Sequence, residues 1–131
     1  MAWDTSDINS NDIIYQDGVF AYLFSNASGN IYAGQSVKIN ADDTVIATSA
    51  GDNGIGIASM NATHGSEIGV FGPGNMVVTA IAGNYSAGTP LYAGDNGIMT
   101  SSQSSSERVM GYVVVAGVQQ TTNYKATVLL V

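Results

Sequence analysis

The sequence predicts an all-β protein: a small single-domain β-barrel or β-sandwich that follows an extended N-terminal arm. Short runs of β-branched and aromatic residues alternate with clusters of Gly, Asn, Asp and Ser, which is the pattern of strands separated by turns. These runs recur roughly every 8–12 residues, a spacing typical of barrels and sandwiches. The good helix formers Leu, Glu, Lys and Arg are scarce, and Gly interrupts nearly every window of helical length.

The N-terminal segment 1–17, MAWDTSDINSNDIIYQD, differs from the rest of the chain. It is acidic and shows no strand period, and it lacks the basic region and apolar core of a signal peptide. We expect either an extended arm that contacts a partner or a frayed terminus. Because aromatic and large apolar side chains anchor interfaces, the candidate contact residues of this arm are Trp3, Ile8, Ile13, Ile14 and Tyr15.

The remaining residues, 18–131, form one expected barrel-like domain that is long enough to bury a core. The expected strands cover residues 19–24, 35–39, 44–48, 54–59, 67–71, 76–81, 90–92, 98–101, 108–116 and 124–131. In QSVKI the alternation predicts that Val37 and Ile39 face inward, while Ser36 and Lys38 face outward. The runs VVVA and TVLLV are apolar throughout, so we expect them to be buried on both faces or covered by another subunit.

Two short motifs occur twice and allow a test for tandem duplication. AGDNGI occupies residues 50–55 and 93–98, 43 positions apart, whereas IYAG at 31–34 and LYAG at 91–94 lie 60 positions apart. A tandem duplication requires one constant offset, so one duplication does not explain both motifs. We interpret them as local reuse of the same turn chemistry.

Each AGDNGI copy is predicted to form a hairpin turn. Asn-Gly is the strongest short hairpin signal, because a type I′ turn requires positive φ at both central residues. Asn53-Gly54 and Asn96-Gly97 fit those positions. The preceding Asp52 and Asp95 can accept hydrogen bonds from the turn backbone. A calcium loop is disfavoured, because each copy offers a single carboxylate and no Glu follows at the required spacing.

The sparse charge disfavours several classes of partner. Charged residues make up 10% of the chain, and the net charge is −7 with only Lys38, Arg108 and Lys125 positive. Nucleic-acid binding requires clustered Lys and Arg, so we expect no nucleic-acid partner. An anionic membrane surface would repel the chain, and the longest apolar run, 109–118, is about half the length of a membrane helix. We therefore expect no membrane partner.

We expect no catalytic site, no metal and no cofactor. The absence of Cys excludes disulfides and thiolate ligands, and a single His cannot build an ordinary zinc site. No Gly-x-Ser-x-Gly nucleophile elbow accompanies His64, which lies in a predicted loop. Glu67 and Glu107 are the only glutamates, and they give no specific signal of a glycosidase pair. A small hydrolase built around His64 is the disfavoured alternative.

The tyrosines keep a binding function of another kind open. Tyrosine rings can stack on sugars, and they equally suit strand cores and interfaces. No sequence pattern gathers them on one face; they are Tyr15, Tyr22, Tyr32, Tyr85, Tyr92, Tyr112 and Tyr124. A carbohydrate-binding or adhesion module on a virion or cell surface is therefore the alternative function.

Three segments in the second half of the chain carry a family resemblance. SAGTPLYAGDNGIMTSS is followed by ERVMGYVVVAG and by the closing KATVLLV, and GIGIA and EIGVF lie upstream. Their order resembles the small head-decoration, or cement, proteins of tailed viruses of bacteria and archaea. The matching strands here cover residues 88–92, 109–113 and 126–131, and the whole likeness covers about residues 30–131. The arm has no counterpart in it.

The resemblance implies a compact β-barrel-like module on the outside of an icosahedral capsid. Proteins of that family often form trimers at three-fold positions and bridge neighbouring major capsid proteins, and they offer no catalytic residues to carry over. We therefore expect a homotrimeric virion protein that is synthesised in the host cytoplasm. Its expected partner is the major capsid protein, which the arm would contact.

Overall fold

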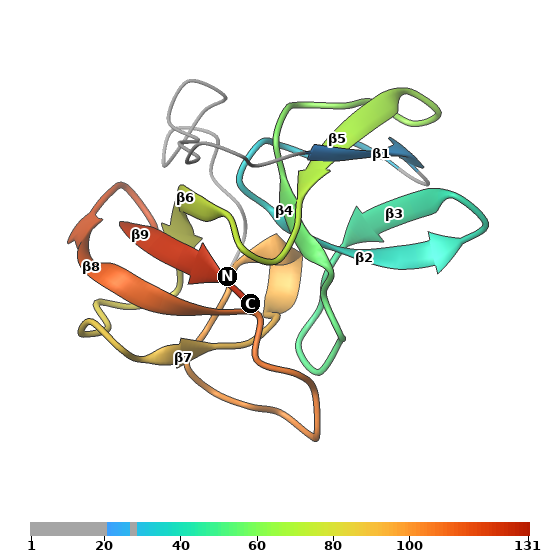
Figure 1. Cartoon of the computed structure of the whole chain (residues 1–131). Coiled ribbons are helices and arrows are strands. Elements are labelled where there is room, and N and C mark those ends of the chain that lie inside the picture. Colours follow the sequence, from blue (N-terminus) through green and yellow to red (C-terminus); the bar gives the residue numbers. More distant parts are fainter. Residues whose placement is uncertain (1–20, 27–28) are drawn as a thin grey trace.

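The computed structural model describes residues 21–26 and 29–131 (Figure 1). Within these ranges the chain forms nine β-strands and a short 3-10 turn, η2, which confirms the predicted all-β fold. The elements are β1 (Ala21–Asn26), β2 (Ser36–Ala41), β3 (Thr44–Ala47), β4 (Gly56–Ala58), β5 (Glu67–Phe71), β6 (Met76–Ile81), β7 (Pro90–Leu91), η2 (Asp95–Gly97), β8 (Gly111–Gln119) and β9 (Tyr124–Leu130). In these residues no helix is long and apolar enough to cross a membrane.

Strands β1 to β5 form a closed barrel in the order β1-β3-β2-β4-β5. Neighbouring strands are antiparallel except β1 and β3, which are parallel. Because side chains alternate along each strand, one set of them fills a common interior. This set is small and aliphatic: Ile31, Val37, Val45, Ala58, Ala62, Ile68 and Val70. We call this barrel the first unit.

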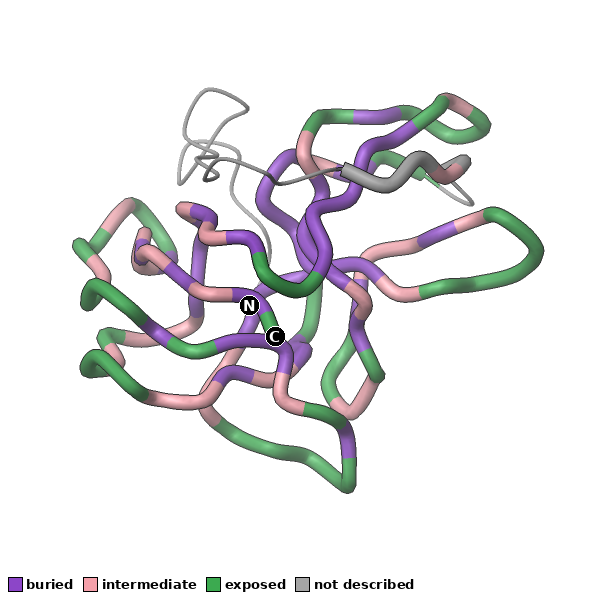
Figure 2. The backbone as a smooth tube through the Cα atoms, viewed as in Figure 1, coloured by how far each residue is buried: buried purple, intermediate pink, exposed green. Residues whose placement is uncertain are grey.

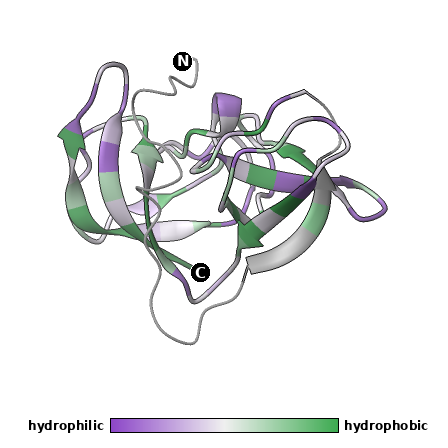
Figure 3. Ribbon diagram, turned by 90° about the horizontal axis from the view of Figure 1, so that it is seen from above, coloured by the Kyte–Doolittle hydropathy of each residue, from purple (hydrophilic) through white to green (hydrophobic). Residues whose placement is uncertain are grey.

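Strands β6 to β9 form a second sheet in the order β6-β9-β8-β7. Residues 98–100 link the two edges of this sheet. Met99 forms a parallel bridge with Ile81 at the end of β6, and Thr100 forms an antiparallel bridge with Tyr92, directly after β7. We call this sheet with its linking segment the second unit; Figure 1 shows it beside the first. Hydrophobic residues gather on the strands, and many turns are hydrophilic (Figure 3).

The two units have the same topology. Strands β1, β2, β3, β4 and β5 correspond in order to β6, β7, segment 98–100, β8 and β9, and the single parallel contact is in the same place. The register agrees as well: Ser36 of β2 pairs with Ile57 of β4, as Pro90 of β7 pairs with Tyr112 of β8. Paired positions of the second unit lie 54 to 58 residues after their counterparts.

Loop hydrogen bonds repeat in the same way. The Gly34 amide donates to the Ala58 carbonyl at 2.8 Å, and the Gly88 amide donates to the Val113 carbonyl at 2.7 Å. Our inference from the motifs, which favoured turn reuse over duplication, is therefore wrong for the fold as a whole. Neither AGDNGI nor IYAG/LYAG has the offset of the structural repeat, so their disagreement could not reveal it.

A second hydrophobic core, separate from the interior of the first barrel, is shared by the two units. Ile57 and Phe71 point out of the first barrel and join the cluster formed by the second unit, which includes Val77, Leu91 and Leu130. Burying one such side chain contributes about 1.5–3 kcal/mol. The buried segments gather where the units meet (Figure 2).

Polar contacts also join the two units. The Gln35 side chain donates to the Asn96 carbonyl at 2.8 Å, and the Arg108 guanidinium donates to the Gly54 carbonyl at 2.8 Å. The Thr48 hydroxyl donates to a carbonyl of the second unit at 3.1 Å. The second unit therefore covers one side of the first barrel with both apolar and polar groups.

The predicted strands differ from the observed ones in informative places. Strands β5 and β6 have the predicted bounds, whereas the predicted strand 98–101 forms bridges only at Met99 and Thr100. The predicted strand 108–116 lies three residues later in the chain, as β8.

The β2 pattern gives the correct direction at Val37 and Ser36 and is wrong at Ile39. Val37 is buried as predicted, but Ile39 is 56% exposed, because the register shifts beyond it and the β2–β3 hairpin extends past the barrel. Ser36 points out of the barrel yet is fully buried, because the second unit covers that side.

Candidate functional site

The arm residues predicted to contact a partner lie outside the described residues. These are Trp3, Ile8, Ile13, Ile14 and Tyr15. The candidate sites described by the structure therefore lie in residues 21–26 and 29–131.

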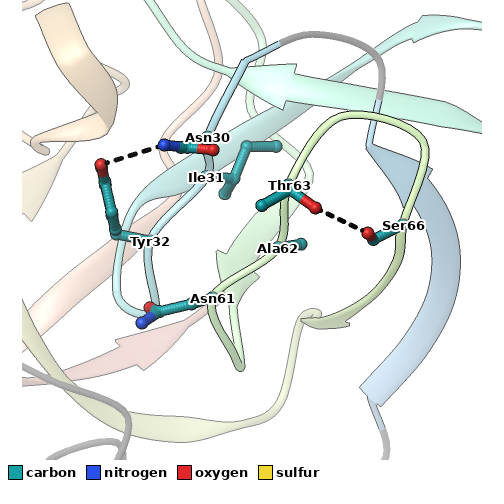
Figure 4. A pocket seen from close by; sticks show the side chains of 7 residues that line it. All are labelled: Asn30, Ile31, Tyr32, Asn61, Ala62, Thr63 and Ser66. Atoms are coloured by element: carbon teal, nitrogen blue, oxygen red, sulfur yellow. Dashed lines mark hydrogen bonds between the residues drawn. The ribbon is translucent and has the colours of Figure 1, made fainter.

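A hollow of about 310 Å³ lies beside the first barrel (Figure 4). It is lined by Asn30, Ile31, Tyr32, Asn61, Ala62, Thr63 and Ser66. Its polar groups largely bind one another or the backbone: the Asn61 carbonyl oxygen accepts a hydrogen bond from the Ala33 amide at 2.8 Å, and the Thr63 and Ser66 hydroxyls are 2.9 Å apart. None of these lining residues is an acid, a base or a histidine, so the hollow offers contact surface rather than acid–base chemistry.

The second AGDNGI copy forms the predicted kind of turn. Asn96 and Gly97 both have positive φ, 57° and 71°, as the central residues of a type I′ turn require. The turn connects β7 to the 98–100 segment through η2.

The first AGDNGI copy does not form that turn, which corrects the prediction. Its positive φ is at Gly51, at 86°, and neither Asn53 nor Gly54 has one. Instead, the Asn53 side chain accepts a hydrogen bond from the Arg108 amide at 2.8 Å. A Cβ at Gly54 would collide with the end of the Met110 side chain, which would have to move. Contacts with the second unit therefore decide the conformation of this copy.

The aspartates of the two copies bind protein groups. Asp52 accepts a hydrogen bond from the Ser49 amide at 2.7 Å and lies 3.0 Å from the Lys38 ammonium. Partial burial raises the pKa of Asp52, but these two partners outweigh it and lower the pKa below 3.8. Asp95 accepts a hydrogen bond from the Ala50 amide of the other copy at 2.9 Å. Both carboxylates thus hold turns together.

Glu107 performs a similar structural task in the loop before β8. Its side chain is buried, and its two oxygens accept hydrogen bonds from the Ser104 and Ser105 amides at 2.9 and 2.8 Å. These hydrogen bonds lower the pKa of Glu107 below 4.5. The serine-rich loop at residues 101–106 is therefore tied to a buried carboxylate.

Other candidate chemical groups are dispersed. His64 is exposed in a turn of the first unit, and Glu67 is exposed at the start of β5. In the described ranges, no three His, Asp or Glu side chains gather as metal ligands would. The described tyrosines are also spread out: Tyr32 lines the hollow, Tyr85 and Tyr124 pack against the second core, and Tyr112 is 41% exposed on β8.

An apolar row crosses the outer side of the second sheet. It consists of Pro90, Tyr112, Leu129 and Met76, which pair in that order across β7, β8, β9 and β6. The next register position, at Val113 and Val128, is buried in the core, so the row points the other way.

We define the outer face as this row together with its neighbours Val78, Val114, Val115 and Thr127. Tyr112, Val114 and Val115 are 41%, 37% and 58% exposed. The four strands of the sheet contain one charged residue, Lys125, and no Asp or Glu. In a chain of net charge −7, this acid-free apolar surface is the feature best suited to bind another protein.

Only part of this face could be predicted from the sequence. The apolar runs VVVA and TVLLV, which contain Val114, Val115 and Leu129, indicated that another subunit could cover them, whereas Met76 and Pro90 join the face only through strand pairing. The pairing of strands that are distant in the sequence must be known before the row can be identified.

Comparison with known proteins shows a shared fold without close sequence relatives. No family model matches the chain, and no curated protein sequence matches it. The chain is similar in structure to the N base of the head fiber protein gp8.5 of bacteriophage phi29, with a TM-score of 0.61 at 14% identity. The alignment covers 84% of this chain and 93% of that one. The chain therefore has the fold of a phage head fiber base.

Proposed function

We propose that this chain is a structural protein of a virion that binds the outside of an assembled icosahedral capsid. In this role it bridges neighbouring major capsid proteins and stabilises the shell, and it performs no enzymatic reaction. The observation that carries the proposal is the fold shared with a phage head fiber base over 84% of the chain. The decoration-protein resemblance of about residues 30–131 supports the same role.

The composition and the described surface suit this role. The acid-free outer face and the exposed apolar hairpin residue Ile39 provide contact surface for proteins. The negative net charge and the scarcity of Lys and Arg favour protein partners over nucleic acid or an anionic membrane. In the proposal, the arm supplies the capsid contact through Trp3 and Tyr15, and the protein acts as a homotrimer.

Capsid stabilisation follows from selective binding. A protein that binds the assembled lattice but not free subunits shifts the equilibrium toward the lattice, by about 2.7 kcal/mol per site at a concentration of 100 times Kd. Many copies on one shell add avidity, so each contact can be modest.

The test measures binding of the full chain to empty capsids of its own virus and to unassembled major capsid protein. We expect co-sedimentation with the capsids, an increase in their melting temperature and no binding to free subunits. Deletion of residues 1–17 should abolish co-sedimentation while the circular dichroism spectrum stays that of a β protein. Absence of binding to any capsid form would contradict the proposal, and unchanged binding after the deletion would remove the arm from it.

A further inference from the structure

In the first unit, the row equivalent to the outer row of the second sheet is covered by the second unit. In the first unit that row contains Ser36, Ile57 and Phe71, whose exposed fractions are 0%, 0% and 4%. The second unit buries them, since Ile57 and Phe71 belong to its core cluster. The row is therefore an interface inside the chain.

The corresponding row of the second unit has no such cover in the described part of the chain. Pro90, Tyr112 and Leu129 occupy the equivalent register positions, and Tyr112 is 41% exposed where Ile57 is fully buried. The exposed segments of β8 are visible in Figure 2. A surface that is an interface in one unit is thus open in the other.

A specific segment makes the polar contacts along the buried row. The turn 94–98 of the second unit packs on the β2 end of that row, where a Cβ at Gly97 would lie 2.8 Å from the Gln35 Cβ. Gln35 and Thr48 also donate hydrogen bonds to carbonyls of this turn, at 2.8 and 3.1 Å. Turn 94–98 therefore lies against the β2 end of the first unit's outer row.

The counterpart of that turn in the first unit is exposed. The repeat relates turn 94–98 to residues 40–44 of the β2–β3 hairpin, which follow the 56% exposed Ile39. The hairpin carries Asp42 and Asp43, both exposed. Together with Ile39, it is thus an exposed apolar and acidic surface at the position equivalent to turn 94–98.

Charge favours contact between the hairpin and the outer face rather than between two identical faces. Each chain carries a net charge of −7, so copies repel one another except where a surface lacks acids. The second sheet has Lys125 and no acid, while the hairpin supplies two aspartates. The two surfaces are therefore complementary in charge, and the repeat relates the hairpin to the turn that contacts the buried row.

We propose that a second copy of this chain covers the outer face with its β2–β3 hairpin, the segment equivalent to the turn that contacts the buried row within one copy. Such a contact uses two different surfaces and joins copies head to tail, and in the homotrimer expected above it closes into a ring. The proposal names the surfaces behind the oligomer expected above. It holds in solution without a capsid, so it can fail independently of capsid binding.

The first experiment measures the mass of the full-length protein by light scattering during size-exclusion chromatography. We expect the wild type to have at least three times the mass of the 13.5 kDa chain. Tyr112→Asp on the outer face and Ile39→Asp on the hairpin should each weaken association by at least about tenfold and give monomers. Met60→Asp is the matched control, because Met60 is 42% exposed and lies outside both surfaces; its mass should equal that of the wild type.

The second experiment mixes the two monomeric variants. Each keeps one intact surface, so an equimolar mixture should form a heterodimer of about twice the mass of one chain. Val115→Asp, at a position 58% exposed, replaces Tyr112→Asp if that variant does not give a wild-type circular dichroism spectrum.

Three results would overturn the proposal. These are a monomeric or dimeric wild type, an oligomer that survives both substitutions, and variants that stay monomeric when mixed. If the wild type is monomeric and Tyr112→Asp abolishes capsid binding, the face belongs to the capsid protein instead. Capsid binding by a monomeric Tyr112→Asp variant would leave the proposed function intact.

Discussion

At the scale of single residues, Glu107 gives a pH prediction. Its hydrogen bonds from the Ser104 and Ser105 amides lower its pKa below 4.5. Because folding lowers this pKa, the stabilisation is fully present above about pH 4.5 and is lost as the pH falls through the folded-state pKa. We expect Glu107→Gln to lower the melting temperature at pH 7, because the amide keeps only one acceptor oxygen, and the difference from wild type to shrink in acid.

Melting curves between about pH 3 and pH 7 check this prediction. Glu67→Gln is the control, since Glu67 is exposed at the start of β5. A difference between wild type and Glu107→Gln that stays constant over this pH range would show that the loop does not depend on the carboxylate charge.

Two equivalent glycines give a second residue-scale prediction. A Cβ at Gly56 or at Gly111 would collide with the carbonyl oxygen of Phe71 or of Leu129, on the neighbouring strand. We expect Gly56→Ala and Gly111→Ala each to lower the free energy of unfolding by about 1–3 kcal/mol, because the strands must move apart. Urea denaturation measures the loss, with Ser102→Ala on an exposed loop as the control. Loss at only one of the glycines would contradict their equivalence.

At the scale of elements, the two Asn-Gly turns show where sequence prediction succeeds and where it stops. Asn96-Gly97 joins two adjacent strands of one sheet, so local turn preference decides its conformation. Asn53 instead accepts a hydrogen bond from Arg108, 55 positions away in the chain. A contact of that range leaves no local signal, so the same six letters fold in two ways.

This difference predicts opposite responses to glycine. At position 96, Gly should be tolerated better than Ala, which should cost about 1–2 kcal/mol, because the backbone of Asn96 has positive φ. At position 53, Gly should destabilise and Asp should be tolerated, because the Arg108 amide needs an acceptor oxygen and the backbone has no positive φ. Melting temperatures of the four variants test this pattern, and a lower melting temperature for Asn96→Gly than for Asn96→Ala would contradict it.

The strands themselves were largely predictable, because apolar runs between turn residues mark them directly. β5 and β6 have the predicted bounds. The error at Ile39 and the burial of the outward-facing Ser36 both arise beyond the strand. The hairpin extends Ile39 into solvent, and the second unit covers Ser36. Strand alternation predicts which side a residue faces, but not whether that side is covered.

At the scale of the whole molecule, the internal repeat could not be recognised from the sequence. Its offset varies between 54 and 58 residues, because the loops of the two units differ in length. Equivalent positions share chemical character more often than identity, as at Val37 and Leu91. The motifs that do repeat in letters, such as AGDNGI, lie at non-equivalent places. The apolar outer face was hidden for the same reason, since it depends on the pairing of distant strands.

The shared core makes the last prediction one of cooperativity. Ile57 and Phe71 belong to the first barrel but are buried in the core of the second unit, so unfolding of either unit would expose part of this core. We therefore expect a single thermal transition for the described part of the chain. Ile68→Ala in the first interior and Leu91→Ala in the second should each cost about 2–5 kcal/mol and shift that same transition.

Calorimetry at fixed protein concentration distinguishes this from independent units. Under the shared-core arrangement, each substitution moves the whole heat-absorption peak and leaves no part at the wild-type temperature. Met60→Ala, at an exposed site, should move it little. Two peaks, of which Ile68→Ala shifts one and Leu91→Ala the other, would mean that the units fold separately and that their interface adds little stability. The proposed contact between two chains uses the hairpin equivalent to turn 94–98, which lies in this interface within one chain. A weak interface between the units would therefore also weaken the case for a ring.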